Sequence, residues 1–139
     1  MVAVGSGTQL DHIQIKYNDD DAFEWFGGAA NLKYGIGTGV TDDNLDYAFG
    51  YQGKIQFVVA HQNKDDTQTS GGGFEVDNSE PPIGTFEDTP ITNPIVSNVT
   101  MIGPGDPAAT KGGQGMLIRR GAGSRIYNGI IQGFRLAGF

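Results

Sequence analysis

The chain has 139 residues, 23 of them glycine, no cysteine, and a net charge of −7. Nine Lys and Arg residues against sixteen acidic ones argue against a nucleic-acid partner, which needs clustered cations on its binding surface. No stretch approaches the roughly 18 consecutive apolar residues of a membrane span. The missing cysteines exclude disulfides and thiol chemistry.

Short runs rich in Ile, Val, Tyr and Phe, bounded by Gly, Asn and Asp, predict strands throughout the chain. In chain order, one set of runs lies at 10–15, 32–37, 55–60, 96–101 and 126–131. A second, shorter set lies at 23–25, 45–47, 74–76 and 116–118. No window shows sustained helical periodicity, so the pattern indicates an all-β protein.

The runs recur with a period of 22 or 23 residues, interrupted by two insertions at 67–73 and 107–113. A period of this length is typical of a solenoid. The sequence therefore predicts a right-handed parallel β-helix of about five coils, forming one domain over residues 1–139. Its inner columns would be Leu10, Leu32, Ile55, Val96 and Ile126, and Phe23, Leu45, Phe74 and Met116.

Alternation along the short runs predicts which side chains face outward. Phe23 and Trp25 would face the core while Glu24 faces solvent, and the next coil repeats the pattern around Asp46. Asn98 and Asn128 fall in register, and asparagine suits a corner that needs left-handed backbone.

The segment 77–94 breaks the rhythm with four prolines, at positions 81, 82, 90 and 94. A central strand does not accommodate them. We expect an insertion loop that leaves coil three and offers a place for a specific contact.

Repeated aspartate pairs are the sharpest chemical feature. If the coils stack in register, Asp20, Asp42, Asp65 and Asp106 share one column, with a second aspartate beside three of them. Stacked like charges repel, and a Ca²⁺ ion, which takes six to eight oxygen ligands, would relieve the repulsion. The alternative is that aspartate serves as a turn residue and that solvent screens its charge. The predicted metal ligands are Asp20, Asp21, Asp42, Asp43, Asp65 and Asp66.

A second acidic column, Glu24, Asp46 and Glu75, lies on the outer face and, with Arg119 and Arg120, forms the predicted ligand-binding set. Carboxylates on adjacent coils would lie about 5 Å apart, which suits a retaining glycosidase, although a solvated acidic face has the same spacing. A polysaccharide lyase would also need calcium and a base, and the clustered cations are Lys111, Arg119, Arg120 and Arg125. His12 and His61 occupy different columns, so they predict no shared metal site, and no catalytic set is recognisable.

Three phrases, DDDAFEWFGG (19–28), GKIQFVV (53–59) and SNVTMIGPG (97–105), resemble stretches of secreted bacterial right-handed parallel β-helix proteins of the cell-surface or lipoprotein-like kind. The resemblance covers residues 5–133. It implies a β-helix in an extracellular or cell-surface setting and implies no catalytic residues. Such proteins are usually longer, so it also implies that these coils are a piece of a larger solenoid.

These observations favour an extracellular structural or binding module for a glycan or a protein, which self-associates by end-to-end stacking of its open ends. The alternative is a lyase or glycoside hydrolase that acts on acidic or environmental glycans. A groove in which carboxylates meet Arg119 or Arg120 would favour the enzyme, and a smooth face would favour binding.

Overall fold

A computed structural model describes residues 1–63, 71–106, 108 and 113–138. In this part of the chain there are two kinds of strand and no helix. The long strands are β1 (Gln9–Lys16), β3 (Asn31–Thr38), β5 (Lys54–His61), β7 (Ile95–Ile102) and β9 (Arg125–Gln132). The short strands are β2 (Phe23–Phe26), β4 (Leu45–Ala48), β6 (Phe74–Val76) and β8 (Met116–Ile118).

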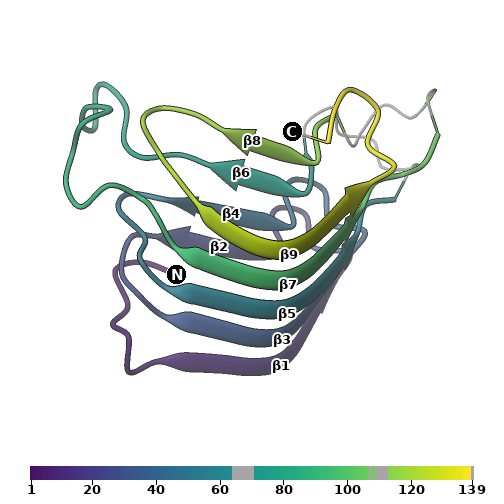
Figure 1. The fold of residues 1–139 in the computed structure, drawn as a ribbon, viewed down its shortest axis with the longest axis horizontal. Helices are drawn as coiled ribbons and strands as arrows, with labels where there is room; N and C mark the ends of the chain where they lie inside the picture. Colours follow the sequence, from purple (N-terminus) through teal and green to yellow (C-terminus); the bar gives the residue numbers. More distant parts are fainter. Residues whose placement is uncertain (64–70, 107, 109–112, 139) are drawn as a thin grey trace.

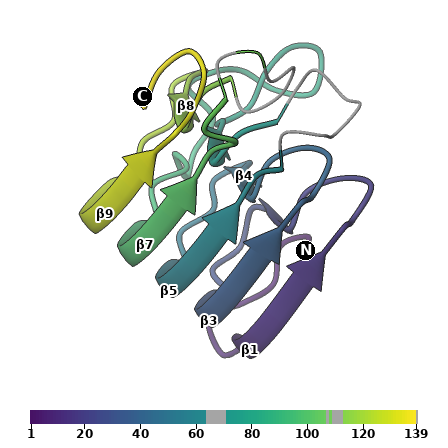
Figure 2. The ribbon, with the colours of Figure 1, turned by 90° about the vertical axis from the view of Figure 1, so that its right-hand side faces the viewer.

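The strands form two parallel sheets that wind around a common core, ordered β1-β3-β5-β7-β9 and β2-β4-β6-β8 (Figure 1). Each of the first four coils contributes one strand to each sheet, the last contributes β9 to the long sheet, and the long strands lie side by side in order along the solenoid (Figure 2). The register joins Leu10, Leu32, Ile55, Val96 and Ile126 into one ladder. It likewise joins Phe23, Leu45, Phe74 and Met116. The predicted parallel β-helix of about five coils is therefore confirmed.

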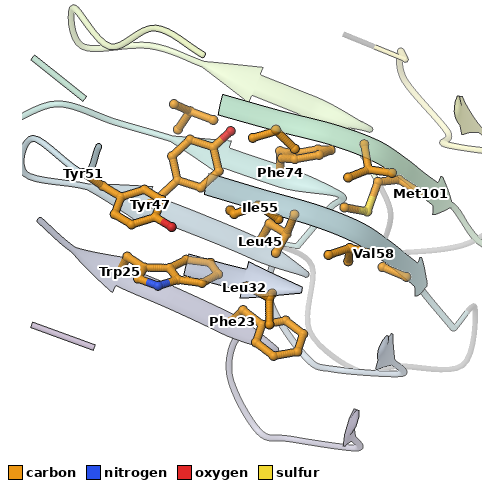
Figure 3. Packing of buried hydrophobic residues seen from close by; sticks show 14 of the residues in the cluster. Phe23, Trp25, Leu32, Leu45, Tyr47, Tyr51, Ile55, Val58, Phe74 and Met101 are labelled. Atoms are coloured by element: carbon orange, nitrogen blue, oxygen red, sulfur yellow. The ribbon is translucent and has the colours of Figure 1, made fainter. Parts of the chain in front are cut away.

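Aliphatic and aromatic columns fill the space between the sheets (Figure 3). Trp25 and Tyr47 are buried, as the alternation of the short strands predicts. Tyr51 is also buried: its ring stacks on Trp25 with centroids 5.1 Å apart, and its hydroxyl donates to the Ala30 carbonyl at 2.7 Å. Burying rings in contact adds about 0.5–1.5 kcal/mol per pair beyond the area they bury.

Every long strand bends at a residue with left-handed backbone. The five residues share one column and have φ between 52° and 58°: His12, Tyr34, Phe57, Asn98 and Asn128. The prediction for the two asparagines is confirmed. Bulky side chains at the same position were not expected, because they rarely adopt this conformation. Their rings stack outside the sheet, with centroids 4.5 Å apart for His12–Tyr34 and 5.1 Å for Tyr34–Phe57.

The segment 77–94 lies between β6 and β7 and forms no strand. Asn78 organises it from a buried position. Its side-chain amide donates to the carbonyls of Phe86 (3.0 Å) and Asp88 (2.9 Å), and its carbonyl accepts from the amide of Thr92 at 2.9 Å. The base of the loop is therefore fixed at the C-terminal end of β6, beside the residues that follow β4.

Candidate functional site

The outer face of the β2-β4-β6-β8 sheet gathers most of the predicted site residues. One outward column is Glu24, Asp46, Glu75 and Leu117. A second outward column begins two residues further along the strands, where Phe26 pairs with Ala48. Asp77 and Arg119, which directly follow β6 and β8, hold the same place in the next two coils. Because the repeat stacks equivalent positions, four separate coils contribute to one surface.

Five carboxylates on this face, or on the turn that leads into it, have raised pKa values. Burial is the largest cause in each: it raises the pKa of Asp21 to about 7, of Asp43 to about 8 and of Asp46 to about 9. Neighbouring carboxylates raise these values further. Burial likewise raises the pKa of Glu24 and of Glu75. The positive charge of the nearby Arg119 lowers the pKa of Glu75, but by less than burial raises it. The cluster therefore holds more negative groups than it can ionise without cost.

Two overlapping groups of these side chains have the spacing of cation ligands. Asp20, Asp21 and Asp42 can each bring one oxygen within 4.8 Å of the others, and so can Asp21, Glu24 and Asp46. Asp21 is common to both groups, and its carboxylate also accepts the backbone amide of Asp43 at 2.8 Å. Carboxylate oxygens are the ligands that Ca²⁺ prefers, so the donor set fits that ion.

The aspartate column is shorter than predicted in the coils that the structure describes. The carbonyl of Gly72 accepts the amide of Asn44, and the amide of Gly73 donates to the carbonyl of Gln114. Gly72 and Gln114 therefore precede β6 and β8, and neither coil has an aspartate directly before its short strand. Asp106 lies instead in a separate hollow with Phe134 and Arg135. The difference arises because the glycine-rich insertions end with glycine or glutamine, rather than aspartate, at these positions before β6 and β8. Asp65, Asp66 and Lys111 lie outside the described residues.

Arg119 and Arg120 meet carboxylates, as the enzyme hypothesis required, but both are held in ion pairs. Asp77 accepts from Arg119 through both oxygens (2.8 and 3.1 Å) and from Arg120 at 2.7 Å. Arg119 also pairs with Glu75 at 2.7 Å, and Arg120 with Glu80 at 2.8 Å. Hydrogen bonding to Asp77 raises the pKa of Arg119, so this side chain is a poor base.

A small hollow of about 170 Å³ opens where the short sheet meets the segment 77–94. Ala48 forms part of its lining because it stands between Phe26 and Asp77, where a larger outward side chain would fill the space. The hollow is lined by Phe26, Asp46, Ala48, Phe49, Asp77, Asn78, Ser79, Glu80 and Arg120. Phe26 and Phe49 contact each other at 5.8 Å between centroids, and Phe26 remains 37% exposed. An aromatic surface beside carboxylates and a guanidinium can stack on an apolar ring face and bind hydroxyls at the same time.

A second, wider hollow of about 380 Å³ lies toward the other end of the short strands. It contains Asp42, Asp43, Glu75 and Arg119, together with Arg135. The two hollows flank Asp46 and Glu75 along the same face, so the acidic column connects them. The face is therefore grooved rather than smooth, which is the feature expected of an enzyme. Arg119 and Arg120 are both held in ion pairs with carboxylates, however, so the groove offers neither of them as a free base.

The structure thus brings together Glu24, Asp46, Glu75, Arg119 and Arg120, all predicted as a set. Sequence reasoning missed Asp77, which links both arginines. The sequence does indicate that Asp77 faces outward, because it follows Glu75 by two residues, which is the spacing of successive outward positions in a strand. The contribution of Ala48 to the hollow could not be predicted from the sequence, because a small apolar residue in a strand has no reactive or polar group that marks a site.

Comparison with known proteins gives one match. A family model described as a pectate-lyase-like β-helix domain matches residues 1–139. No curated protein and no solved structure matches the chain. Among the described residues, no helix has the length and apolar character needed to cross a membrane.

Proposed function

Because the chain belongs to the pectate-lyase-like β-helix family, we propose that it is an extracellular module that binds a glycan on the outer face of the β2-β4-β6-β8 sheet. One observation carries the proposal: the hollow at Ala48 combines the exposed ring of Phe26 with the carboxylates of Asp46 and Glu80. Sugars present an apolar ring face and polar hydroxyls, and this lining offers a partner to each. Domains of this family are often extracellular, which supports the setting.

The charge of the face restricts the glycan. A neutral glycan needs no counterion here, since its hydroxyls donate to the carboxylates. An acidic glycan would be repelled unless a cation lies between the two surfaces. We propose that Ca²⁺ serves this purpose, held by Asp21 with Asp20 and Asp42 or with Glu24 and Asp46. Binding of neutral glycans should then be independent of calcium, whereas binding of polygalacturonate should require it.

Replacing Phe26 by alanine is expected to weaken binding of a neutral polysaccharide at least tenfold, because the stacking surface is lost. Affinity electrophoresis in gels containing single polysaccharides measures this directly. The matched control is Phe57→Ala: Phe57 is 39% exposed, nearly the same as Phe26, but lies on the five-stranded sheet. An equal loss of affinity in both variants, or no loss of affinity in either, would contradict the proposed location.

A second candidate function, glycoside hydrolysis, has one observation in its favour. Asp46, with its pKa raised to about 9, would be protonated at neutral pH, while an oxygen of Glu24 lies within 4.8 Å of it. A protonated acid beside a second carboxylate is the arrangement of a retaining glycosidase, in which one group protonates the leaving oxygen and the other attacks. A lyase is less well supported, because Arg119 is held protonated by Asp77.

Hydrolysis predicts that reducing ends appear when the protein is incubated with the polysaccharide that it retains in the gel. Asp46→Asn should then abolish release, by at least a hundredfold, because general acid catalysis typically contributes that much. Retention of a polysaccharide without any release of reducing ends would leave the binding function standing and reject the hydrolase.

A further inference from the structure

The outward sides of the two sheets differ in charge. The five long strands contain four basic residues, Lys16, Lys33, Lys54 and Arg125, and one acidic residue, Asp11. Each of these directly precedes or follows a residue that packs in the core, so its side chain points outward. The four short strands contain three acidic residues and no basic one. In a chain of net charge −7, the long sheet therefore has a positive outer face.

This positive face also carries an apolar patch. Tyr34 and Ile36 of β3 lie beside Phe57 and Val59 of β5, and all four side chains are 39–48% exposed. The Lys33 ammonium lies 5.6 Å from the ring centroid of Tyr34 and 5.7 Å from that of Phe57. Both strands have a neighbour on either side, so the exposure of the patch does not depend on where the sheet ends. Contiguous exposed apolar side chains, unlike scattered ones, mark interaction surfaces.

The backbone at the two rings is unfavourable for them. Tyr34 and Phe57 have φ of 56° and 58°, in the column where later coils have Asn98 and Asn128. Asparagine adopts this left-handed conformation more easily than a bulky residue does. Backbone held in a sparsely populated conformation costs free energy and is concentrated at functional sites. The two exposed rings thus occupy positions that asparagine would suit better, which indicates a role for them in solvent.

The arrangement of the rings disfavours a sugar as the partner of this patch. Tyr34 stacks between His12 and Phe57, with centroids 4.5 and 5.1 Å away, so it offers its edge rather than its face to solvent. A sugar would need an open ring face. The long strands also curve around the core, which makes their outer side convex (Figure 1), and no long-strand residue lines either hollow of the short-sheet face.

An anionic lipid surface fits the patch better. Its head groups are negative and complement the lysines, whereas the boundary between head groups and acyl chains accepts aromatic and aliphatic side chains. Aromatic and aliphatic side chains beside Lys and Arg are the usual composition of protein surfaces that lie on a bilayer. Neither property requires a cleft.

We propose that the outer face of the β1-β3-β5-β7-β9 sheet binds the surface of an anionic lipid bilayer. Tyr34 and Phe57 enter the boundary region together with Ile36, and Lys33 and Lys54 contact lipid phosphates. The acidic outer face of the short sheet belongs to the other sheet of the solenoid, where salt screens its repulsion from the bilayer. The proposed glycan site stays open in this arrangement. The lipid proposal uses a different surface from the glycan proposal and does not depend on it.

Co-sedimentation with vesicles tests the proposal, using phosphatidylcholine alone or mixed equally with phosphatidylglycerol. The chain is expected to bind the mixed vesicles, and added salt should weaken binding. Lys33→Gln/Lys54→Gln should reduce the partition coefficient about thirtyfold, because each lysine near an anionic surface contributes roughly fivefold. Tyr34→Asn/Phe57→Asn should reduce it at least tenfold through the loss of two inserted rings. This variant should fold, since the same column already holds two asparagines, and thermal unfolding checks it.

Two controls make the outcome specific. Phe26→Ala removes a ring of similar exposure from the short-sheet face and should leave vesicle binding intact. Arg135→Gln removes an exposed cation outside the long strands and should leave it almost unchanged. Absence of binding to the mixed vesicles, or an equal loss in the Phe26 variant, would overturn the proposal. Binding to soluble polyglutamate without binding to vesicles would overturn it in favour of an acidic protein partner.

Discussion

Replacing Asp77 by alanine is expected to destabilise the protein by about 3 kcal/mol, the low end of the range for breaking a buried ion pair. Asp77 is 8% exposed and accepts hydrogen bonds from two arginines. Without it, the guanidiniums of Arg119 and Arg120 lose their shared partner at the junction between β6, β8 and the segment 77–94. Partial access of solvent to both arginines limits the loss.

A loss of this size is a large fraction of the 5–15 kcal/mol that typically holds a domain folded. Urea unfolding measures it, provided that the slope of the transition is unchanged. The matched control is Glu80→Ala, which removes one carboxylate from the same Arg120. The Glu80 side chain is 43% exposed, so its removal should cost no more than about 1 kcal/mol. Similar losses in the two variants would show that Asp77 is not the centre of the network.

The second large effect concerns pH. Without calcium, the protein is expected to be less stable at pH 8 than at pH 5. Burial raises the pKa of Asp21, Asp43 and Asp46 to about 7, 8 and 9, whereas an unfolded aspartate titrates near 4. Between pH about 4 and 9 the folded state therefore binds more protons than the unfolded state, so stability falls as pH rises through this window.

Calcium should restore stability at pH 8 and have little effect at pH 5, where protons compete for the same oxygens. Replacing Asp46 by asparagine should raise the free energy of unfolding at pH 8 by roughly 2 kcal/mol, because it removes a buried carboxylate whose ionisation is unfavourable. The gain is no larger because water still reaches the cluster and screens its charges. The same variant should reduce the calcium effect. Thermal unfolding at the two pH values, with calcium or with EGTA, measures all three.

Asp19→Asn is the control, because Asp19 is exposed on the same turn and should change neither the pH dependence nor the calcium effect. Stability that increases from pH 5 to pH 8 would mean that the carboxylates are solvated turn residues. The expected pH dependence without any effect of calcium would reject the metal and leave the buried acidic cluster in place.

The columns of the solenoid could be predicted from sequence because stacking imposes one residue type on each position. Leu10, Leu32 and Ile55 share a chemical environment that no single coil defines, so the repeat itself carries the information. The same logic predicted that Glu24, Asp46 and Glu75 face outward together, and the strand pairing confirms it.

The aspartate column shows where this reasoning fails. Counting forward from the long strand predicts Asp106 beside Asp42, but Asp106 lies in a separate hollow, and the register with coil three resumes at Gln114. Stacking fixes positions inside strands, whereas a glycine-rich turn of variable length is free to place its side chains elsewhere. The hollow at Ala48 could not be predicted for another reason: it depends on the small size of a side chain rather than on a reactive group.

The left-handed column was predicted only in part. Asn98 and Asn128 indicate this backbone conformation, because asparagine tolerates it. Tyr34 and Phe57 do not, and they adopt it because the stacked neighbours impose the bend and the rings gain contact with each other. Neighbouring coils thus overrule the local preference of an individual residue.

The central claim, that a glycan binds the outer face of the short sheet, is tested most directly by nuclear magnetic resonance. The ¹⁵N-labelled chain would be titrated with neutral oligosaccharides derived from a polysaccharide that it retains. We predict that amide shifts move at Phe26, Asp46, Phe49 and Glu80 and that those of Tyr34 and Phe57 stay fixed. Shifts confined to the five-stranded sheet, or the absence of any shift at saturating sugar, would contradict the account.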